Sequence, residues 1–193
     1  MSPKLFFFTL LLTLPAVGAE QSAFARMHQP GSEQSALAAR AGIWDVIDTA
    51  WESPGAAPVV TRMIAERTMI GAFMQEVIKP RLETPMKDAN RIDYLSFNRV
   101  EGRWKYVSMD MRAPVGLMPA ASFGRGDKAT ISLVFEPFAV PGDGAMVSGQ
   151  MLRMEQRIVF TDPDHDLKEQ RFTMADGTGA GWLAHRYSYT RRK

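Results

Sequence analysis

The stretch ARAGIWDVIDTAW, residues 39–51, decides the fold class of this chain. Gly42 and Trp44 open it, apolar and polar residues then alternate, and Trp51 closes it. Alternation with a period of two is typical of a β-strand. The side of the strand that begins at Trp44 is apolar apart from Asp48, and the side that begins at Ile43 mixes apolar and polar residues. Neither side is therefore cleanly polar. We therefore predict a strand that is packed on both faces near one end of a barrel.

The rest of the chain repeats this pattern in short segments. Runs rich in β-branched and aromatic residues alternate with clusters of Gly, Pro, Asn and Asp, without the long 3.6-residue period of a helix. Many short strands at this spacing indicate an antiparallel sandwich or barrel. We predict strands near residues 43–52, 59–69, 72–79, 91–98, 103–111, 119–124, 129–136, 149–160, 167–174 and 181–191.

The N-terminal residues 1–19 have the features of a cleaved signal peptide. Lys4 is followed by an apolar run over residues 5–14, and small residues precede a cleavage site after Ala19. The run is about half of the ~20 residues that span a bilayer, so we expect no integral membrane segment after cleavage. The expected location is periplasmic or secreted.

Residues 20–35 are predicted to form a polar tether and the start of a short helix. Ser32 with Glu33 in the following position is typical of a helix N-cap and first turn, and the helix is expected to end by Arg40. The barrel domain is then expected over residues 36–193.

Composition limits the classes of function. Of 193 residues, 46% are hydrophobic and 23% charged, as in a single globular domain. The net charge is +2 and the basic residues are dispersed, whereas nucleic-acid binding needs a concentrated basic face. We therefore expect no nucleic-acid partner. Because the chain has no cysteine, disulfides, thiol catalysis and thiolate metal sites are excluded. The oligomeric state stays open.

Gly42-x-Trp44 after a short helix resembles the signature of lipocalins and the wider calycin superfamily. In those barrels the tryptophan closes one end and packs against an arginine late in the last strand. Arg191 or Arg192 stands where that partner would be. The resemblance implies an all-β fold, a single antiparallel lipocalin-like barrel of about ten strands in which Trp44 and Arg191 form the closure.

A longer pattern resembles a bacterial, often exported family that is catalogued only as a domain of unknown function. The family implies a small calycin-type barrel and no established catalytic residues. Ala72 and the pair Phe97-Asn98 depart from its usual text. The residues that carry this resemblance are Gly42-x-Trp44, Arg62, Gly71-Ala72-Phe73-Met74, Glu76, the stretch IDYLSFNRVEGRWKYVSMD and Tyr187-x-Tyr189-Thr190-Arg191.

Neither a metal site nor a cofactor is predicted. The histidines His28, His165 and His185 have no metal-motif spacing. A single barrel histidine such as His185 can serve as a haem ligand, but a packed or hydrogen-bonded role is favoured. The stretch DPDHD, residues 162–166, has the spacing of the first calcium ligands of an EF-hand, but Leu167 occupies the position that needs glycine. We interpret it as a solvated hairpin turn.

Aromatic and polar residues on neighbouring strands favour a ligand pocket, since such pockets combine apolar walls with a few aimed polar groups. The leading hypothesis is non-enzymatic binding of a small, mainly apolar molecule, and no catalytic residue is assigned. One alternative is an acid–base enzyme that uses Glu76, Asp110 or His185. Another is an envelope interaction module with a filled core. The candidate ligand-binding residues are Phe73, Glu76, Tyr94, Trp104, Tyr106, Asp110 and His185.

Overall fold

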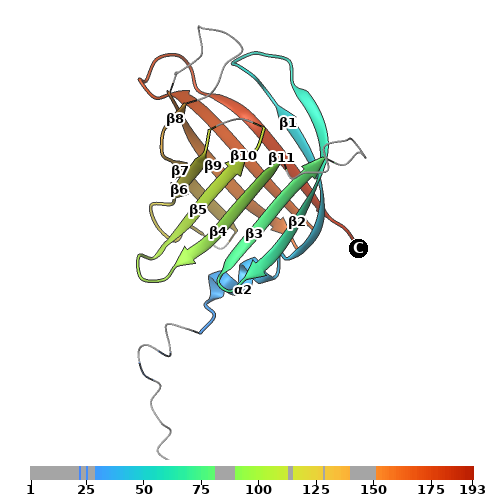
Figure 1. The fold of residues 1–193 in the computed structure, drawn as a ribbon, viewed down its shortest axis with the longest axis vertical. Coiled ribbons are helices and arrows are strands. Elements are labelled where there is room, and N and C mark those ends of the chain that lie inside the picture. Colours follow the sequence, from blue (N-terminus) through green and yellow to red (C-terminus); the bar gives the residue numbers. More distant parts are fainter. Residues whose placement is uncertain are drawn as a thin grey trace, which may run out of the picture.

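The computed structural model describes residues 22, 25, 29–80, 90–112, 115–127, 129–139 and 151–193. The strands form one closed antiparallel barrel, and helix α2 (Ser32–Ala38) lies across one of its ends (Figure 1). The predicted signal peptide lies outside the described residues. No helix in the described part is long and apolar enough to cross a membrane.

The barrel has ten strands in its ring, as the sequence predicts. Strands that follow each other pair from β1 to β7, then β7 pairs with β9, β9 with β10 and β10 with β11, and β11 pairs with β1 to close the ring. The elements are β1 (Gly42–Ala50), β2 (Val59–Ile70), β3 (Phe73–Pro80), β4 (Arg91–Asn98), β5 (Arg103–Asp110), β6 (Leu117–Ala121), β7 (Thr130–Phe135), β8 (Phe138–Ala139), β9 (Met151–Asp162), β10 (His165–Met174) and β11 (Trp182–Arg191).

Two details of the strands differ from the sequence-based prediction. The short β8, which pairs with the start of β9, was not expected because two residues give no period to detect. Strand β6 covers Leu117–Ala121 rather than residues 119–124. The tight turn between β2 and β3 is explained by its sequence. Gly71 adopts the positive φ of +60° that a two-residue hairpin loop requires.

Helix α2 (Ser32–Ala38) closes the lower end of the barrel in Figure 1. Its Leu37 is fully buried in an apolar cluster that extends through the barrel as far as Met118 and Met154. The predicted N-cap is wrong by one position. Gly31 is the N-cap residue, and Ser32 is already helical and makes no capping hydrogen bond to the helix backbone.

Strand β1 has one buried face, not two as predicted. Trp44, Val46 and Asp48 point into the barrel and are buried, whereas Ile43 and Ile47 point outward and are 48% and 44% exposed. The reason is the closure of the sheet, because a barrel covers the inner face of each strand and leaves the outer face to solvent. The interruption at Asp48 is therefore a polar position inside the barrel.

Trp44 and Arg191 form the contact that joins the first and last strands. The Arg191 guanidinium carbon lies 4.3 Å from the centre of the buried Trp44 ring. Its Nη1 and Nη2 donate to the carbonyl oxygens of Ala41 and Ala39 at 2.7 and 2.6 Å, directly after α2. Gly42 is needed here because its φ is +130° and a Cβ would lie 3.0 Å from Arg191 Nη1.

The Arg67 guanidinium carbon also lies 4.7 Å from the Trp44 ring centre. We expect Trp44→Ala to lower the free energy of unfolding by about 3–5 kcal/mol, because it leaves a cavity between the guanidinium groups of Arg67 and Arg191. Urea unfolding followed by circular dichroism measures this. Ile43→Ala, on the outer face of the same strand, is the matched control and should lose far less. A loss below about 1 kcal/mol for Trp44→Ala would show that the indole does not hold this end of the barrel closed.

Candidate functional site

Charged side chains fill the middle of the barrel. They come from β2, β3, β4 and β10 and from the residues after α2, at inward-facing positions. Cations and anions alternate along the barrel from the helix-covered end towards the opposite end, and we call this row the charge chain. Its members, in order of contact, are Arg40, Asp166, Arg67, Glu76, Lys168, Asp93 and Arg91.

Glu76 lies at the centre of the charge chain. Arg67 Nε donates to its Oε2 at 2.6 Å, Lys168 Nζ donates to its Oε1, and the Tyr189 hydroxyl donates to Oε1 at 3.1 Å. Burial by itself raises the pKa of the Glu76 carboxyl, but the charges of Lys168 and Arg67 outweigh it and hold the pKa below its ordinary value. Glu76 is therefore a buried carboxylate.

Asp93 is shared by two cations in the same way. Arg91 Nε donates to Oδ1 at 2.8 Å and Lys168 Nζ donates to Oδ2 at 3.1 Å. Burial raises the pKa of Asp93, and the charges of Arg91 and Lys168 more than reverse this. The remaining donors of Arg91 reach neutral oxygens, the hydroxyls of Tyr106 at 3.0 Å and Tyr187 at 3.3 Å.

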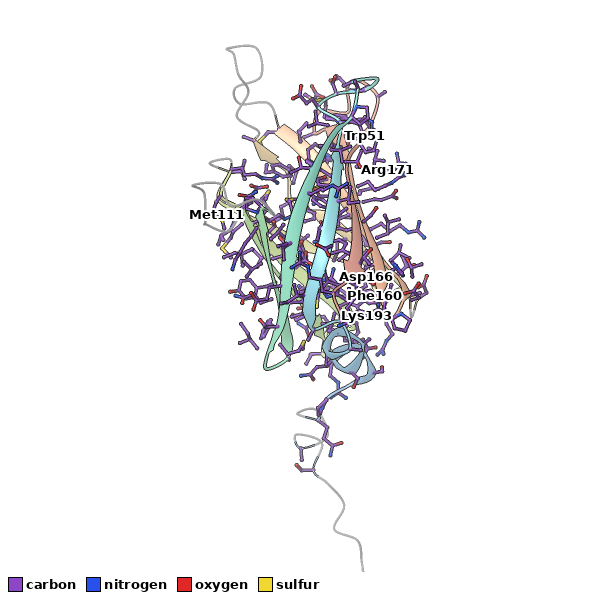
Figure 2. The ribbon with its side chains drawn as sticks, turned by 90° about the vertical axis from the view of Figure 1, so that its right-hand side faces the viewer. Trp51, Met111, Phe160, Asp166, Arg171 and Lys193 are labelled. Atoms are coloured by element: carbon purple, nitrogen blue, oxygen red, sulfur yellow. The ribbon has the colours of Figure 1, made fainter. Side chains whose placement is uncertain are left out.

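Asp166 joins the charge chain to the helix-covered end (Figure 2). It accepts hydrogen bonds from Arg40 Nη1, at 2.9 Å, and from Arg67 Nη1. Burial raises the pKa of Asp166, which Arg67 and Arg40 offset only in part. The interpretation of DPDHD as a solvated turn holds for the exposed Asp162 and is wrong for Asp166, whose position in β10 faces inward.

The space left inside the barrel lies at its two ends. The cavity within the charge chain measures about 10 Å³, too small for anything beyond a water molecule. Beside α2 is a cleft of about 350 Å³, which we call the helix-end cleft, and at the opposite end is the open-end cavity of about 130 Å³. The helix-end cleft is walled by Ala36, Trp104, Ile131 and Phe160, with Ser32, Glu33, Arg125, Gly126 and Asp127 around it.

The structure distributes the predicted site residues over several places. Glu76 and Tyr106 lie in the filled middle of the barrel, and Trp104 lies in the helix-end cleft. Asp110 and His185 line the open-end cavity. These five residues point inward, but the structure does not bring them into one site.

Phe73 and Tyr94 lie on the outer surface of the barrel, contrary to the prediction that they contribute to an interior site. Phe73 is 52% exposed, and Tyr94 is paired across strands with Gln75, on the face opposite Glu76. An odd offset along a strand places a residue on the other face, so neither side chain can share the interior with Glu76.

Sequence reasoning missed most of the charge chain. In β10 the inward residues Asp166, Lys168 and Gln170 are polar, while the outward Leu167 is apolar. Alternation alone favours burial of Leu167. Only the inward charged residues that bond to β10, Arg67 on β2 and Asp93 on β4, could have indicated the reverse. In the described part of the chain, no group of three or more histidine, aspartate or glutamate side chains is placed to hold a metal ion.

We expect Glu76→Gln to lower the free energy of unfolding by about 3–5 kcal/mol, because it leaves Arg67 and Lys168 buried without their shared anion. Denaturant unfolding at neutral pH measures the loss. Glu66→Gln, on the exposed face of β2, is the matched control and should stay within about 0.5 kcal/mol of the wild type. Equal losses for the two variants would contradict the role of the charge chain.

Acid should destabilise the protein through the same carboxylates. The folded-state pKa values of Glu76 and Asp93 are lowered, so their contributions are complete above the unfolded values of about 4.3 and 3.9 and are lost as pH falls through the folded values. Asp166 has a raised pKa in the folded state, so its contribution to stability increases as pH falls, but it is one group against two. Urea unfolding between pH ~6 and ~3 should show falling stability below about pH 4. A flat or rising profile there would contradict this.

Comparison with known proteins supports the fold and supplies the family. No protein with a curated description matches the chain. The crystal structure of Rv2717c from M. tuberculosis is similar to it, with a TM-score of 0.52 and 13% identity over 86% of this chain and 100% of that one. At this identity the likeness shows the fold alone. A family model described as a protein of unknown function (DUF1579) matches residues 29–189, so the chain belongs to the DUF1579 family.

Proposed function

We propose that the protein binds a small, mainly apolar molecule in the helix-end cleft, without chemistry. The observation that carries the proposal is the cleft itself. Its volume of about 350 Å³ falls within the range of small-molecule pockets, roughly 300–1,000 Å³. Trp104, Ile131 and Phe160 give it apolar walls, and Glu33 and Arg125 supply the few polar groups that such pockets carry at their rim.

The floor of the helix-end cleft separates the ligand from the charge chain. Phe160 lines both the cleft and the small central cavity, and the Arg40 guanidinium carbon lies 4.7 Å from its ring centre. This side chain therefore keeps the apolar space apart from the buried charges. A molecule in the cleft would contact the outer side of the Phe160 ring.

The rim is built so that it can open at small energetic cost. Arg125 forms an ion pair with Glu33 of α2, and its side chain is 61% exposed. Exposed ion pairs contribute only about 0–1 kcal/mol. The walls are more firmly held, since Trp104 Nε1 donates to the carbonyl oxygen of Arg125 at 2.8 Å.

A second hollow near α2 fits an apolar molecule less well. It measures about 430 Å³, but Phe97 is the one large apolar side chain among the described residues that line it. The other side chains include those of Gln29, Gln34 and Arg99. We therefore assign the ligand to the helix-end cleft.

The acid–base alternative gains no support from Glu76, because both its carboxylate oxygens are bonded to cations. The interaction-module alternative gains support from the filled middle of the barrel and from the outer face of β3 to β6. There Val77, Ile92, Met109 and Leu117 form an apolar row across four strands. Native mass spectrometry of the protein purified from its host's envelope fraction separates ligand binding from the interaction-module alternative, since a ligand adds a small mass and a partner protein a large one.

The location remains part of the proposal. We place the protein in the periplasm or outside the cell on the basis of Lys4, the apolar run over residues 5–14 and the small residues that end at Ala19. Cell fractionation together with the N-terminal sequence of the purified protein tests this.

We expect the variant Ala36→Trp to fill the helix-end cleft and to weaken binding of the neutral apolar probe N-phenyl-1-naphthylamine by ~10-fold or more. Fluorescence titration measures the affinity. Ala38→Trp places the same side chain on the exposed face of α2 and should bind as the wild type does. Unchanged binding by Ala36→Trp would move the ligand away from this cleft.

A further inference from the structure

The open-end cavity has an apolar wall above a charged floor. It measures about 130 Å³, room for about four water molecules at ~30 Å³ each. The floor is Arg91, Gln170 and Tyr187, where the charge chain ends. The wall consists of Val115, Met118, Phe138, Met154 and Phe172.

The charge chain carries one more cation than anion. It begins and ends with an arginine, and each of its three carboxylates is shared between two cations. Arg40, at the helix-covered end, keeps 13% of its side chain exposed, whereas the Arg91 side chain is only 4% exposed. A buried cation that shares its counter-ion is incompletely neutralised. Of the two arginines that end the charge chain, the one at the floor of the open-end cavity is therefore the more deeply buried.

Other carboxylates near this cavity have partners of their own. Asp110 accepts from Arg112 Nε and Nη2 at 2.9 and 2.6 Å. Asp48 is 3.1 Å from His185 Nδ1. Two guanidinium groups and one carboxylate thus line the cavity, so that its charge favours an anionic occupant.

Tyr187 adds a hydroxyl between the two guanidinium groups. It accepts from Arg91 Nη1 at 3.3 Å, and it lies close enough to Arg112 to feel the charge of that guanidinium. Burial raises the pKa of Tyr187, so the phenol keeps its proton and can donate a hydrogen bond to an anion. The ring of Phe172, 6.3 Å from that of His185, offers an apolar edge to a flat molecule.

We propose that the open-end cavity binds a small organic carboxylate with a compact apolar or aromatic body. The carboxylate meets Arg112 and the Tyr187 hydroxyl, while Arg91 contributes its charge from the floor. Asp110 engages Nε and Nη2 of Arg112, and the outer end of a planar guanidinium can still match a carboxylate in two hydrogen bonds. The body packs against the methionine and phenylalanine side chains of the wall. This site is separate from the helix-end cleft and does not depend on it.

The test uses benzoate as the probe, with benzamide as a neutral molecule of the same shape and sulfate as an anion without an apolar body. Each is titrated at constant ionic strength into the full protein, followed by calorimetry and by the methyl signals of Met118 and Met154. Benzoate should bind ~10-fold or more tightly than either of the others, and should shift both methyl signals.

Arg112→Gln should weaken benzoate binding by ~10-fold and leave the binding of N-phenyl-1-naphthylamine unchanged. Arg103→Gln is the matched control, since Arg103 is similarly exposed and also pairs with the carboxylate two residues before it, that of Glu101. Both side chains are partly exposed, so both variants should fold.

Four results would overturn the proposal. Equal affinity for benzoate and benzamide would show that the cavity does not recognise the negative charge. Equal affinity for benzoate and sulfate would show that the apolar body does not contribute to binding. Benzoate binding that survives in Arg112→Gln, or that leaves the Met118 and Met154 methyl signals unmoved, would place the anion elsewhere on the protein. None of these outcomes bears on the helix-end cleft, which is tested with a neutral probe.

Discussion

The sharing of each buried carboxylate between two cations is the constraint on which the rest of this barrel depends. Glu76 is held by Arg67 and Lys168, and Asp93 by Lys168 and Arg91. Removing a member from within the row takes a counter-ion from both of its neighbours, and a buried charge that loses its partner is strongly destabilising. Such a row fixes the position of β10 relative to β2, β3 and β4, because Asp166 and Lys168 of β10 bond across the barrel to charged residues of those three strands.

This filling of the interior determines where ligands can lie. A lipocalin-like barrel with an empty lumen would hold a molecule along its axis, whereas here the axis is occupied by side chains and the free volume is divided between the ends. The two ends differ in character. The helix-end cleft is shielded from the ions by Phe160, and the open-end cavity has Arg91 and Tyr187 as its floor. Two ends of one barrel can therefore favour ligands of different chemistry.

Much of the fold could be predicted from the sequence, and less of the site. Turn residues separate the strands so clearly that their positions follow from local composition, and Gly42, Trp44 and Arg191 indicated how the ends meet. Glu76 and Tyr106 were expected in the interior, but Arg67 and Lys168 were not. Whether a charged residue can be buried depends on partners about 100 positions away, such as Asp166 for Arg67, and the pattern of a single strand contains no information about them. Phe73 was misplaced because its apolar character suggested the interior while its offset from Glu76 required the outside.

The pairing of β1 with β11 has a consequence for how the chain reaches its native state. Trp44 faces Arg191 across this pair, so the ring is completed by segments from the two ends of the domain. Hairpins between neighbouring strands can form while the polypeptide is still emerging, but the last seam must wait for the final strand to be released. Contacts of such large sequence separation slow folding, and they leave the edges of β1 and β10 open until then. Two strand edges are therefore open to aggregation until β11 has paired, and the loss of this one strand would leave an open sheet rather than a slightly smaller barrel.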